Sequence, residues 1–332
     1  MNHELLIVGE VLIDAFPDSE VSGGAPYNVA RNLGFLGQHA LMISRTGDDA
    51  TGQRIRREMQ QIPLTTAGLQ TDSVLPTGRV NVEFDVHTHN HHFHILREQA
   101  YDSIDASAAL QAYRDWHNDG ARTILCCGTL IQREATSRQA LHSLLAEIKP
   151  LVFLDVNLRE GQYDAATVLA SMQFADIVKL NQDEWRYLRS LLSKQNKVSE
   201  GDVRTQDKQD NRMPEPVALQ QMLTHFELQA LIVTLGADGY RYADRQGNFL
   251  SSGDIRHEMV LADTVGAGDA FSSIFLLGLM QRWPLPQALE RAHTFAGAMC
   301  GVRGAVGDAA FYAQWKQRWQ LDHRRQQRNL HV

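Results

Sequence analysis

The chain has 332 residues, a length that at ~150 residues per domain fits one large α/β domain with an appendage, or two smaller units. Its 32 Lys and Arg against 39 Asp and Glu give a net charge of −7, which argues against a dedicated nucleic-acid-binding protein. The three cysteines, two of them adjacent, exclude a disulfide framework and a four-cysteine zinc site, and they suit a reducing cytosol.

Short apolar runs alternate with amphipathic stretches along most of the chain. Runs that are rich in β-branched residues or Leu on both faces predict strands covered on both sides, at 5–9, 40–45, 123–127, 151–157, 177–181 and 230–235. Helical patterns lie near 51–61, 107–118, 134–148, 164–174, 182–192, 217–227, 267–282 and 286–302. This alternation predicts an α/β fold with a mainly parallel central sheet and helices on both faces.

Two segments depart from the alternation. Residues 77–97 alternate apolar and polar side chains, which predicts a half-exposed antiparallel strand pair in a small projecting sheet. Residues 193–216 are polar, nearly lack large apolar side chains and end in two prolines. We interpret them as a surface insertion and not as a domain boundary, so that 1–332 forms one domain.

The apolar run Leu5–Val8 is flanked by Glu4 and Glu10 and follows no basic region, so it does not resemble a signal peptide. The most apolar later stretch, 270–280, is far shorter than the ~18 residues that a membrane span needs. We therefore expect a cytoplasmic protein with no membrane partner.

The strongest signal for chemistry is DTVGAGDAF at 263–271, because apolar residues recur behind it at helical spacing up to Gly278. The first amides of that helix lack intrahelical partners and its dipole end is positive, which makes a phosphate site. Asp269 would repel a bound phosphate, but beside a phosphoryl site it suits the base that takes a hydroxyl proton. The alternative is a capped helix start.

The chain has no GxxxxGK(S/T) motif, which excludes a P-loop enzyme.

A second glycine-rich motif, SGGAPYNVARNLG, occupies 22–34. Pro26 suits the first turn of a helix, which Gly37 would end. The paired glycines bring the backbone close to another group, and Asn28 projects from the first turn. The alternative is a plain tight turn.

These two motifs resemble the signatures of the ribokinase-like (PfkB) sugar kinases, and the resemblance extends over nearly the whole chain. Further matches follow in order, with GEVLID at 9–14, DVNLR at 155–159, NQDE at 181–184 and TLGADG at 234–239. GGAP, DVNLR, the pair Glu184-Trp185, GTLIQR at 128–133 and AYD at 100–102 are most similar to fructokinases. The resemblance implies a three-layer α/β/α domain with a small β-sheet lid, built from segments near 11–22 and 75–100.

The resemblance also implies roles for single residues. Asp269 would be the catalytic base. The anion hole for the transferring phosphoryl group would be formed by Gly266, Ala267 and Gly268. Sugar hydroxyls would be bound by Asp14, Gly23, Gly24 and Asn28, and Arg159 would also contact the substrate.

For ATP and its ions, Asn181 and Glu184 match the NxxE motif that organises Mg²⁺ and its waters, although the same spacing also suits a capped helix start. The nucleotide loop is matched by Thr234, Gly236 and Gly239. His293 falls where the family often lines the adenine site, but one His on a helix is more often structural. Some members hold a monovalent cation such as K⁺, here at Asp263 and at backbone carbonyls near Val265, Val302 and Gly304.

The sequence departs from the family at Tyr27, where a small residue is usual, and in the insertion at 193–216. A run of histidines in the expected lid (His87, His89, His91, His92, His94) could bind a metal, but no carboxylate cluster accompanies it. For the basic tail from Trp315 onward, we expect a solvated terminal helix and no RNA contact.

We therefore expect an ATP-dependent sugar kinase, a transferase that phosphorylates a primary hydroxyl, with fructose as the first candidate substrate. A sugar acid of the 2-keto-3-deoxygluconate type, paired by Arg97 or Arg159, or a nucleoside are alternatives within the family. A sugar-sensing protein without catalysis is the alternative from another class. Exposed edges of the lid sheet predict a homodimer through the lid.

Overall fold

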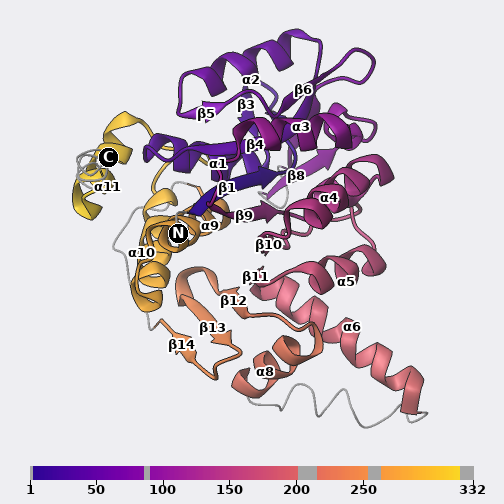
Figure 1. Cartoon of the computed structure of the whole chain (residues 1–332), viewed down its shortest axis with the longest axis vertical. Helices are drawn as coiled ribbons and strands as arrows, with labels where there is room; N and C mark the ends of the chain where they lie inside the picture. Colours follow the sequence, from indigo (N-terminus) through magenta and orange to yellow (C-terminus); the bar gives the residue numbers. More distant parts are fainter. Residues whose placement is uncertain (1–2, 86–89, 201–214, 253–262, 322–332) are drawn as a thin grey trace.

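The computed structural model describes residues 3–85, 90–200, 215–252 and 263–321 (Figure 1). Its larger sheet is formed by β1 (His3–Val8), β4 (Ala40–Gly47), β5 (Leu64–Thr65), β6 (Leu69–Asp72), β9 (Arg122–Cys127), β10 (Leu151–Asp155), β11 (Ile177–Asn181), β12 (Ala230–Thr234), β13 (Tyr240–Asp244) and β14 (Phe249–Ser251). The strand order is β14-β13-β12-β11-β10-β9-β1-β4-β5, with β6 also paired to β4. All pairs are parallel except those of β13, which runs antiparallel to both of its neighbours.

Helices cover both faces of this sheet (Figure 1). One face carries α1 (Ala25–Phe35), α9 (Ala267–Gln281), α10 (Leu285–Met299) and α11 (Ala309–Trp319). The other carries α3 (Ala106–Trp116), α4 (Ala135–Ile148), α5 (Ala165–Phe174), α6 (Gln182–Glu200) and α8 (Glu215–His225). α2 (Ala50–Gln60) packs near β4 and β5, and the short 3₁₀ helices are η1 (Ala100–Ser103), η2 (Leu130–Gln132) and η3 (Gly236–Asp238).

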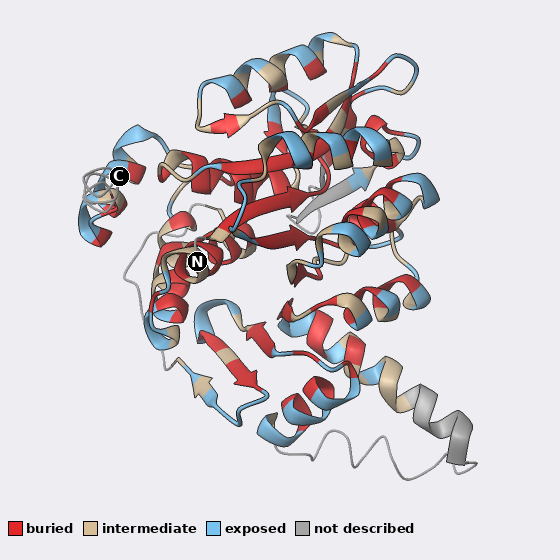
Figure 2. Cartoon of the chain, in the orientation of Figure 1, coloured by how far each residue is buried: buried red, intermediate tan, exposed pale blue. Residues whose placement is uncertain are grey.

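The core lies in two layers because alternate side chains of each parallel strand point to opposite faces. Leu5 and Ile7 of β1 belong to the buried cluster under α1, α9 and α10, whereas Leu6 and Val8 belong to the cluster under the other helices. Figure 2 shows buried residues along the central strands and on the inner faces of the helices. The predicted three-layer α/β/α fold with a mainly parallel sheet is confirmed.

A second, four-stranded sheet has the order β3-β2-β7-β8. Its strands are β2 (Leu12–Ala15), β3 (Glu20–Gly23), β7 (Gly78–Asp85) and β8 (Asn90–Ile95). β7 and β8 pair in antiparallel fashion, as the alternation at 77–97 predicts, and Val80 and Val82 are buried. β2 pairs with β7 in parallel, so both predicted lid segments meet in one separate sheet.

Other segments extend or fall outside these expectations. α6 continues to Glu200, so residues 193–200 of the predicted insertion are helical, and 201–214 lie outside the described residues. The hypothesis of a metal bound by the histidine run also falls largely outside them, because His87 and His89 are not described. The antiparallel edge formed by β13 and β14 has no counterpart among the predicted strands.

The basic tail, expected to form a solvated helix from Trp315 onward, is described only as far as Leu321; this part includes the end of α11 and is partly buried, and 322–332 lie outside the described residues. Trp315 and Trp319 are each 5% exposed, and their rings lie 5.4 and 5.8 Å from the ring of Phe295 in α10. The charges of the tail obscure a second pattern, because Tyr312, Trp315 and Trp319 recur at helical spacing. They form a single inward-facing stripe.

Cys126 and Cys127 are buried free thiols, and Cys300 is a half-buried one. Within the described ranges, no helix has both the length and the apolar character that crossing a bilayer requires.

Candidate active site

The N-termini of α1 and α9 meet beyond the carboxyl ends of the central strands. Gly24 and Gly266 precede the two helices with φ of 106° and 78°, in the region that favours glycine. A side chain at Gly266 would come within 2.4 Å of Cβ of Ala305. Both N-cap residues are glycines, so no N-cap side chain occupies the first amides of either helix, and those amides that have no other partner can bind an anion or a hydroxyl oxygen.

Asp269 lies in the first turn of α9, directly after Ala267 and Gly268, and is 8% exposed. Its Oδ2 accepts a 2.7 Å hydrogen bond from Nδ2 of Asn28 in the first turn of α1. Burial raises the pKa of Asp269, against the opposing effects of the Asn28 bond and of two cations, Lys179 and Arg159. A carboxylate whose charge burial disfavours is a good proton acceptor, and this one lies in the first turn of α9, at the positive end of the helix dipole.

Asp14 in β2 faces the same region. A Cβ at Gly23 would lie 2.2 Å from its Oδ2, so the carboxylate rests against the glycine backbone. Burial raises the pKa of Asp14 to about 6, and the positive charges of Arg159 and Arg31 oppose that shift. Arg159 is exposed, and its field also reaches Asp269. The predicted substrate residues Asp14, Gly23, Gly24, Asn28 and Arg159 are therefore brought together with Asp269.

Arg31 is a site residue that the sequence prediction missed. Its Nη2 donates to the Ser22 carbonyl at 2.6 Å and also to Oδ1 of Asn28, which fixes the orientation of the Asn28 amide. The guanidinium lies 4.7 Å from the centre of the Tyr27 ring, and Tyr27 is fully buried. Tyr27 thus supports Arg31 from the core. The spacing of three residues between Asn28 and Arg31 was the available signal.

Glu10 was also missed, although it lies in the quoted GEVLID motif. Its Oε1 accepts a hydrogen bond from the Ala25 amide at 3.2 Å, and its buried Oε2 has no hydrogen-bond partner in the described structure. Burial raises the pKa of Glu10 to about 7. Glu10 lines a small cavity together with Asp155 and Asn157.

The residues predicted for the nucleotide lie at the ends of two adjacent strands. Asn181 ends β11 and Thr234 ends β12, and the two are paired in register. Gly236 begins η3 and Gly239 follows it, with φ of 61° and 95°, and a Cβ at Gly239 would overlap Ser252. The backbone there adopts a tight loop that only glycines accommodate without strain.

The NxxE pair also forms the capped helix start that the sequence left as an alternative. Oδ1 of Asn181 accepts the amides of Asp183 and Glu184 at 2.9 Å each. The buried Glu184 carboxylate accepts the amides of Asn181 at 2.7 Å and of Leu158 at 2.8 Å. Burial raises the pKa of Glu184, and the nearby Asp155 carboxylate adds to the effect. Glu184 therefore connects the start of α6 to the loop after β10.

His293 and Asp263 complete the predicted set. His293 is buried in α10 with its ring edge-on to Tyr240 at 6.0 Å, next to the glycine loop. Oδ1 of Asp263 accepts the Val265 amide at 2.9 Å, and Oδ2 accepts the Gly304 amide at 3.1 Å. Asp263 thereby joins the segment before α9 to the turn after α10, where Val302 also lies.

Lys179 of β11 is a third missed residue. It is paired in register with Asp155 of β10, and its Nζ donates to both Asp155 carboxylate oxygens at 3.0 and 2.9 Å. Ser272 of α9 donates to the same carboxylate at 2.7 Å. Lys179 Nζ lies 3.0 Å from the position that a Cβ would take at Gly268, so this ammonium lies next to the helix start. Burial lowers the pKa of Lys179, but Asp155 and Glu184 outweigh it and raise the pKa.

No group of three or more His, Cys, Asp or Glu side chains that could hold a metal occurs among the residues the structure describes. The carboxylates of Asp155 and Glu184 instead lie singly around Lys179, with acceptor capacity left for water.

Comparisons with known proteins agree with this architecture. The sequence profile of the pfkB family carbohydrate kinases matches residues 3–310. A fructokinase of Escherichia coli is 25% identical over 297 residues, which cover 84% of this chain and 85% of the relative. A putative sugar kinase of Pyrococcus horikoshii is 26% identical over 302 residues, 82% of each chain.

Solved structures share the fold. The fructokinase of Vibrio cholerae with fructose, ADP and calcium bound superposes with a TM-score of 0.73 at 22% identity, covering 94% of this chain and 98% of the other. The aminoimidazole riboside kinase of Salmonella enterica, complexed with aminoimidazole riboside and an ATP analog, gives a TM-score of 0.72 at 21% identity, covering 95% and 99%.

Proposed function

The chain belongs to the pfkB family of carbohydrate kinases, and we propose that it transfers the γ-phosphate of ATP to a primary hydroxyl of a small sugar, with fructose as the first candidate. The observation that carries this proposal is the position of Asp269. It is a buried carboxylate in the first turn of α9, a helix whose N-cap is Gly266, and it is bonded to Asn28.

The chemistry follows from that position. The hydroxyl proton of the sugar passes to Asp269 while the sugar oxygen forms a bond to the γ-phosphorus. The bond from that phosphorus to the bridging oxygen of ADP breaks in the same displacement. The amides of Gly266, Ala267 and Gly268 stabilise the charge on the transferring phosphoryl group, because they are fixed at the positive end of a helix dipole.

The sugar would lie between the second sheet and the α1 start. Asp14 and Asn28 would hold its hydroxyls, with the Gly23 and Gly24 backbone allowing a close approach. Asp14 already lies against Gly23, and Asn28 is held by Arg31. Bonds from β2 and from the first turn of α1 would orient the reacting hydroxyl toward Asp269, which reduces the entropy that the reaction must lose.

The nucleotide would lie along the carboxyl ends of β11 and β12, with Thr234, Gly236 and Gly239 around its phosphates and ribose and His293 near the base. Both Glu184 oxygens already accept backbone amides, but each carboxylate oxygen has a further lone pair that can accept a water hydrogen. We therefore propose that Glu184 contacts Mg²⁺ through bound water and not directly. Mg²⁺ usually keeps several waters and binds phosphates with one or two carboxylates, and when bound it neutralises phosphate charge.

A monovalent cation such as K⁺ is proposed near Asp263. This carboxylate already gathers Val265 and Gly304, and the carbonyls of Val265, Val302 and Gly304 would supply the other oxygens. An increase in activity on replacing Na⁺ by K⁺, absent in Asp263→Ala, is the expected result.

Fructose is preferred because several relatives at 25–26% identity are fructokinases. A sugar acid is the second candidate, supported by the exposed Arg159 near Asp14, which could pair with a carboxylate. Arg97, the other arginine that could pair with a substrate carboxylate, already contacts Glu134 and the Gly161 carbonyl. A nucleoside is the third candidate, because one structural neighbour is a riboside kinase.

The test is a panel of fructose, other hexoses, ribose, 2-keto-3-deoxygluconate and nucleosides, assayed by coupled ADP release. Fructose should give the largest kcat/KM. A preference for the sugar acid that is lost in Arg159→Met would transfer the assignment to the second candidate. Sugar binding without any ADP release would instead favour a sugar-sensing protein.

We also propose that the second sheet acts as a lid and forms a homodimer contact in the cytoplasm. Its outer strands β3 and β8 have no further strand partner among the described residues, so their edges are open to another copy. A dimeric mass by light scattering that becomes monomeric when proline is placed in β3 would support the contact, and a monomeric wild type would refute it.

A further inference from the structure

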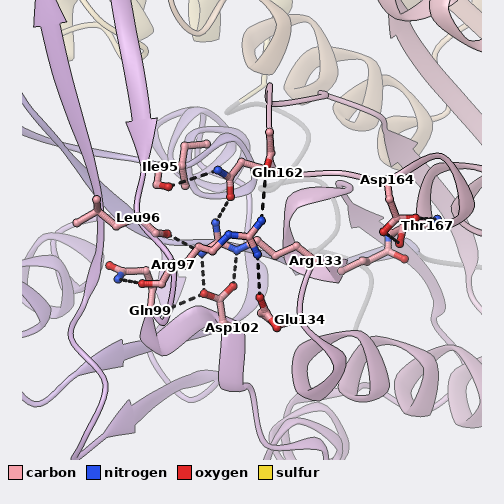
Figure 3. A network of polar contacts seen from close by, with 12 residues as sticks. Ile95, Leu96, Arg97, Gln99, Asp102, Arg133, Glu134, Gln162, Asp164 and Thr167 are labelled. Atoms are coloured by element: carbon pink, nitrogen blue, oxygen red, sulfur yellow. Dashed lines mark hydrogen bonds and ion pairs between the residues drawn. The ribbon is translucent and has the colours of Figure 1, made fainter.

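A buried guanidinium lies at the base of the second sheet. Arg133 follows η2, and its side chain is 2% exposed against 4% for that of Asp102 (Figure 3). Nε of Arg133 donates to Oδ1 of Asp102 at 2.8 Å, and Nη2 donates to Oδ2 at 2.6 Å. This paired geometry is the strongest that arginine makes with a carboxylate, so it fixes the plane of the guanidinium.

The remaining donors of Arg133 reach two other segments (Figure 3). Nη2 also donates to the carbonyl of Leu96, the residue after β8, at 2.8 Å. Nη1 donates at 2.5 Å to Oε1 of Gln162, which belongs to the loop after β10. Gln162 Nε2 in turn reaches the Ile95 carbonyl at 3.4 Å. One guanidinium therefore holds the end of β8 and this loop together.

The loop that Gln162 closes carries Arg159. The backbone amide of Gln162 donates to the backbone carbonyl of Arg159 at 2.9 Å, so the two residues share one turn. The positive charge of Arg159 opposes the rise that burial causes in the pKa values of Glu10, Asp14 and Asp269, so its field reaches all three carboxyls of the site. A second link, from Arg97 to Glu134 and Gly161, has contacts of 3.4 Å and is more than one-third exposed, so it contributes little.

We propose that Arg133 is a positioning residue that, through Gln162, sets the Arg159 loop and the base of β8 as one unit over the substrate. The inference rests on the proposed function, since it takes the substrate to lie between the second sheet and Asp269. If the Arg133–Asp102 pair were purely structural, it would stabilise the fold without affecting substrate affinity. If the pair positions Arg159, its loss changes the KM for the substrate.

The decisive variant is Gln162→Met, which removes the link and leaves the buried Arg133–Asp102 pair intact. Its matched control is Gln70→Met, because Gln70 is also half-buried and its side chain also bonds backbone groups, at both the amide and the carbonyl of Asp105. Gln70 does not contact the network. Both variants are combined with Arg159→Met, and KM and kcat are measured with fructose and ATP, or with the panel substrate that the wild type converts fastest.

The expected result is a KM for the substrate raised about fivefold or more in Gln162→Met, with kcat changed less and the melting temperature near that of wild type. In the Arg159→Met background the same substitution should add almost nothing, because its target is gone. Gln70→Met should leave KM unchanged in both backgrounds. The double variant Arg133→Met/Asp102→Leu, which leaves no unpaired buried charge, should reproduce the KM effect.

Independent, multiplying effects of Gln162→Met and Arg159→Met would overturn the proposal, as would an unchanged KM in Gln162→Met. Either outcome in an active enzyme leaves the kinase assignment standing. A wild type that phosphorylates no member of the panel would refute the proposed function itself. Hydrogen exchange then tests the coupling between the end of β8 and the Arg159 loop without an activity assay. Gln162→Met should accelerate exchange at 94–97 and 157–162 together, and an acceleration confined to 157–162 would refute the coupling.

Discussion

Asn28 donates a 2.7 Å hydrogen bond from Nδ2 to Oδ2 of Asp269, although 241 residues separate the two in sequence. The bond joins the first turns of α1 and α9. It favours the charged form of Asp269, whereas burial favours the neutral form. Oδ1 of Asp269 takes no part in this bond. Arg31 holds the other end of the Asn28 amide, so the orientation of Asp269 depends on a chain of three side chains.

Asn28→Asp should therefore impair Asp269 through its charge. Two carboxylates at this distance share a proton, which raises one of their pKa values strongly. We expect the acidic limb of the kcat/KM profile to move to higher pH. Activity at pH 7 should fall about tenfold or more, with partial recovery at pH 9. The control Asn28→Ala removes the donor without adding a charge, so its limb should move less. Equal shifts would show that charge is not the cause.

Glu10→Gln tests the buried carboxyl beside the α1 start. Because burial raises the pKa of Glu10 to about 7, the folded state binds the proton more tightly than the unfolded chain. The contribution of Glu10 to the free energy of unfolding is fully present below the pKa of Glu10 in the unfolded chain, and it is lost as pH rises through about 7. The amide that replaces the carboxyl in Glu10→Gln is neutral at every pH.

Chemical unfolding at pH 5 and pH 8 provides the measurement. The free energy of unfolding of Glu10→Gln, relative to wild type, should increase between these values by roughly 1–3 kcal/mol. A difference that stays constant with pH would mean that Glu10 titrates in its ordinary range.

Lys179→Met should separate the structural and electrostatic roles of the buried ion pair. The single variant leaves Asp155 unpaired in the core, which costs about 3–5 kcal/mol of stability. Lys179→Met/Asp155→Leu should recover most of that loss. If the ammonium beside Gly268 stabilises the phosphoryl group, kcat stays roughly 10²-fold low in both variants. Recovery of kcat together with stability would assign the pair to folding alone.

Much of the fold could be predicted because its signals are local. The covered strands are continuous apolar runs, and the alternation of Val80 and Val82 sets the second sheet apart. The start of α9 follows from its glycines and the helical spacing behind them. These patterns depend on neighbouring residues, which is the information that one sequence carries.

Arg31 had a local signal, its spacing of three residues from Asn28, but Lys179 and Arg133 depend on strand order and tertiary contacts. Lys179 meets Asp155 only because β11 pairs with β10 in a particular register. Arg133 meets Asp102 across η1 and η2. The buried face of α11 was obscured by the surrounding charges, and β13 lies between β12 and β14, antiparallel to both, outside the strand–helix alternation from which the other strands were predicted.

The second sheet should close over bound sugar. Saturating fructose, or the preferred panel sugar, should protect the amides of β7 and β8 from hydrogen exchange, because closure excludes water from the site. Strands β9 and β1, buried in the main sheet, serve as the internal reference. Unchanged exchange in 78–85 and 90–95 at saturation, with binding verified by calorimetry, would remove the lid assignment.

Asp269→Asn is the most direct test of the account. The substitution preserves shape but removes the proton acceptor, and positioned bases contribute ~10² to 10⁴ in rate, so kcat should fall by about that factor. The Kd for sugar should change little, since Asp14 and the Gly23-Gly24 backbone still hold it. Stability should stay within the ~0.3–1 kcal/mol that a first-turn charge contributes. A folded Asp269→Asn enzyme with near wild-type turnover, measured where chemistry limits the rate, would make Asp269 a helix-capping residue and contradict the mechanism.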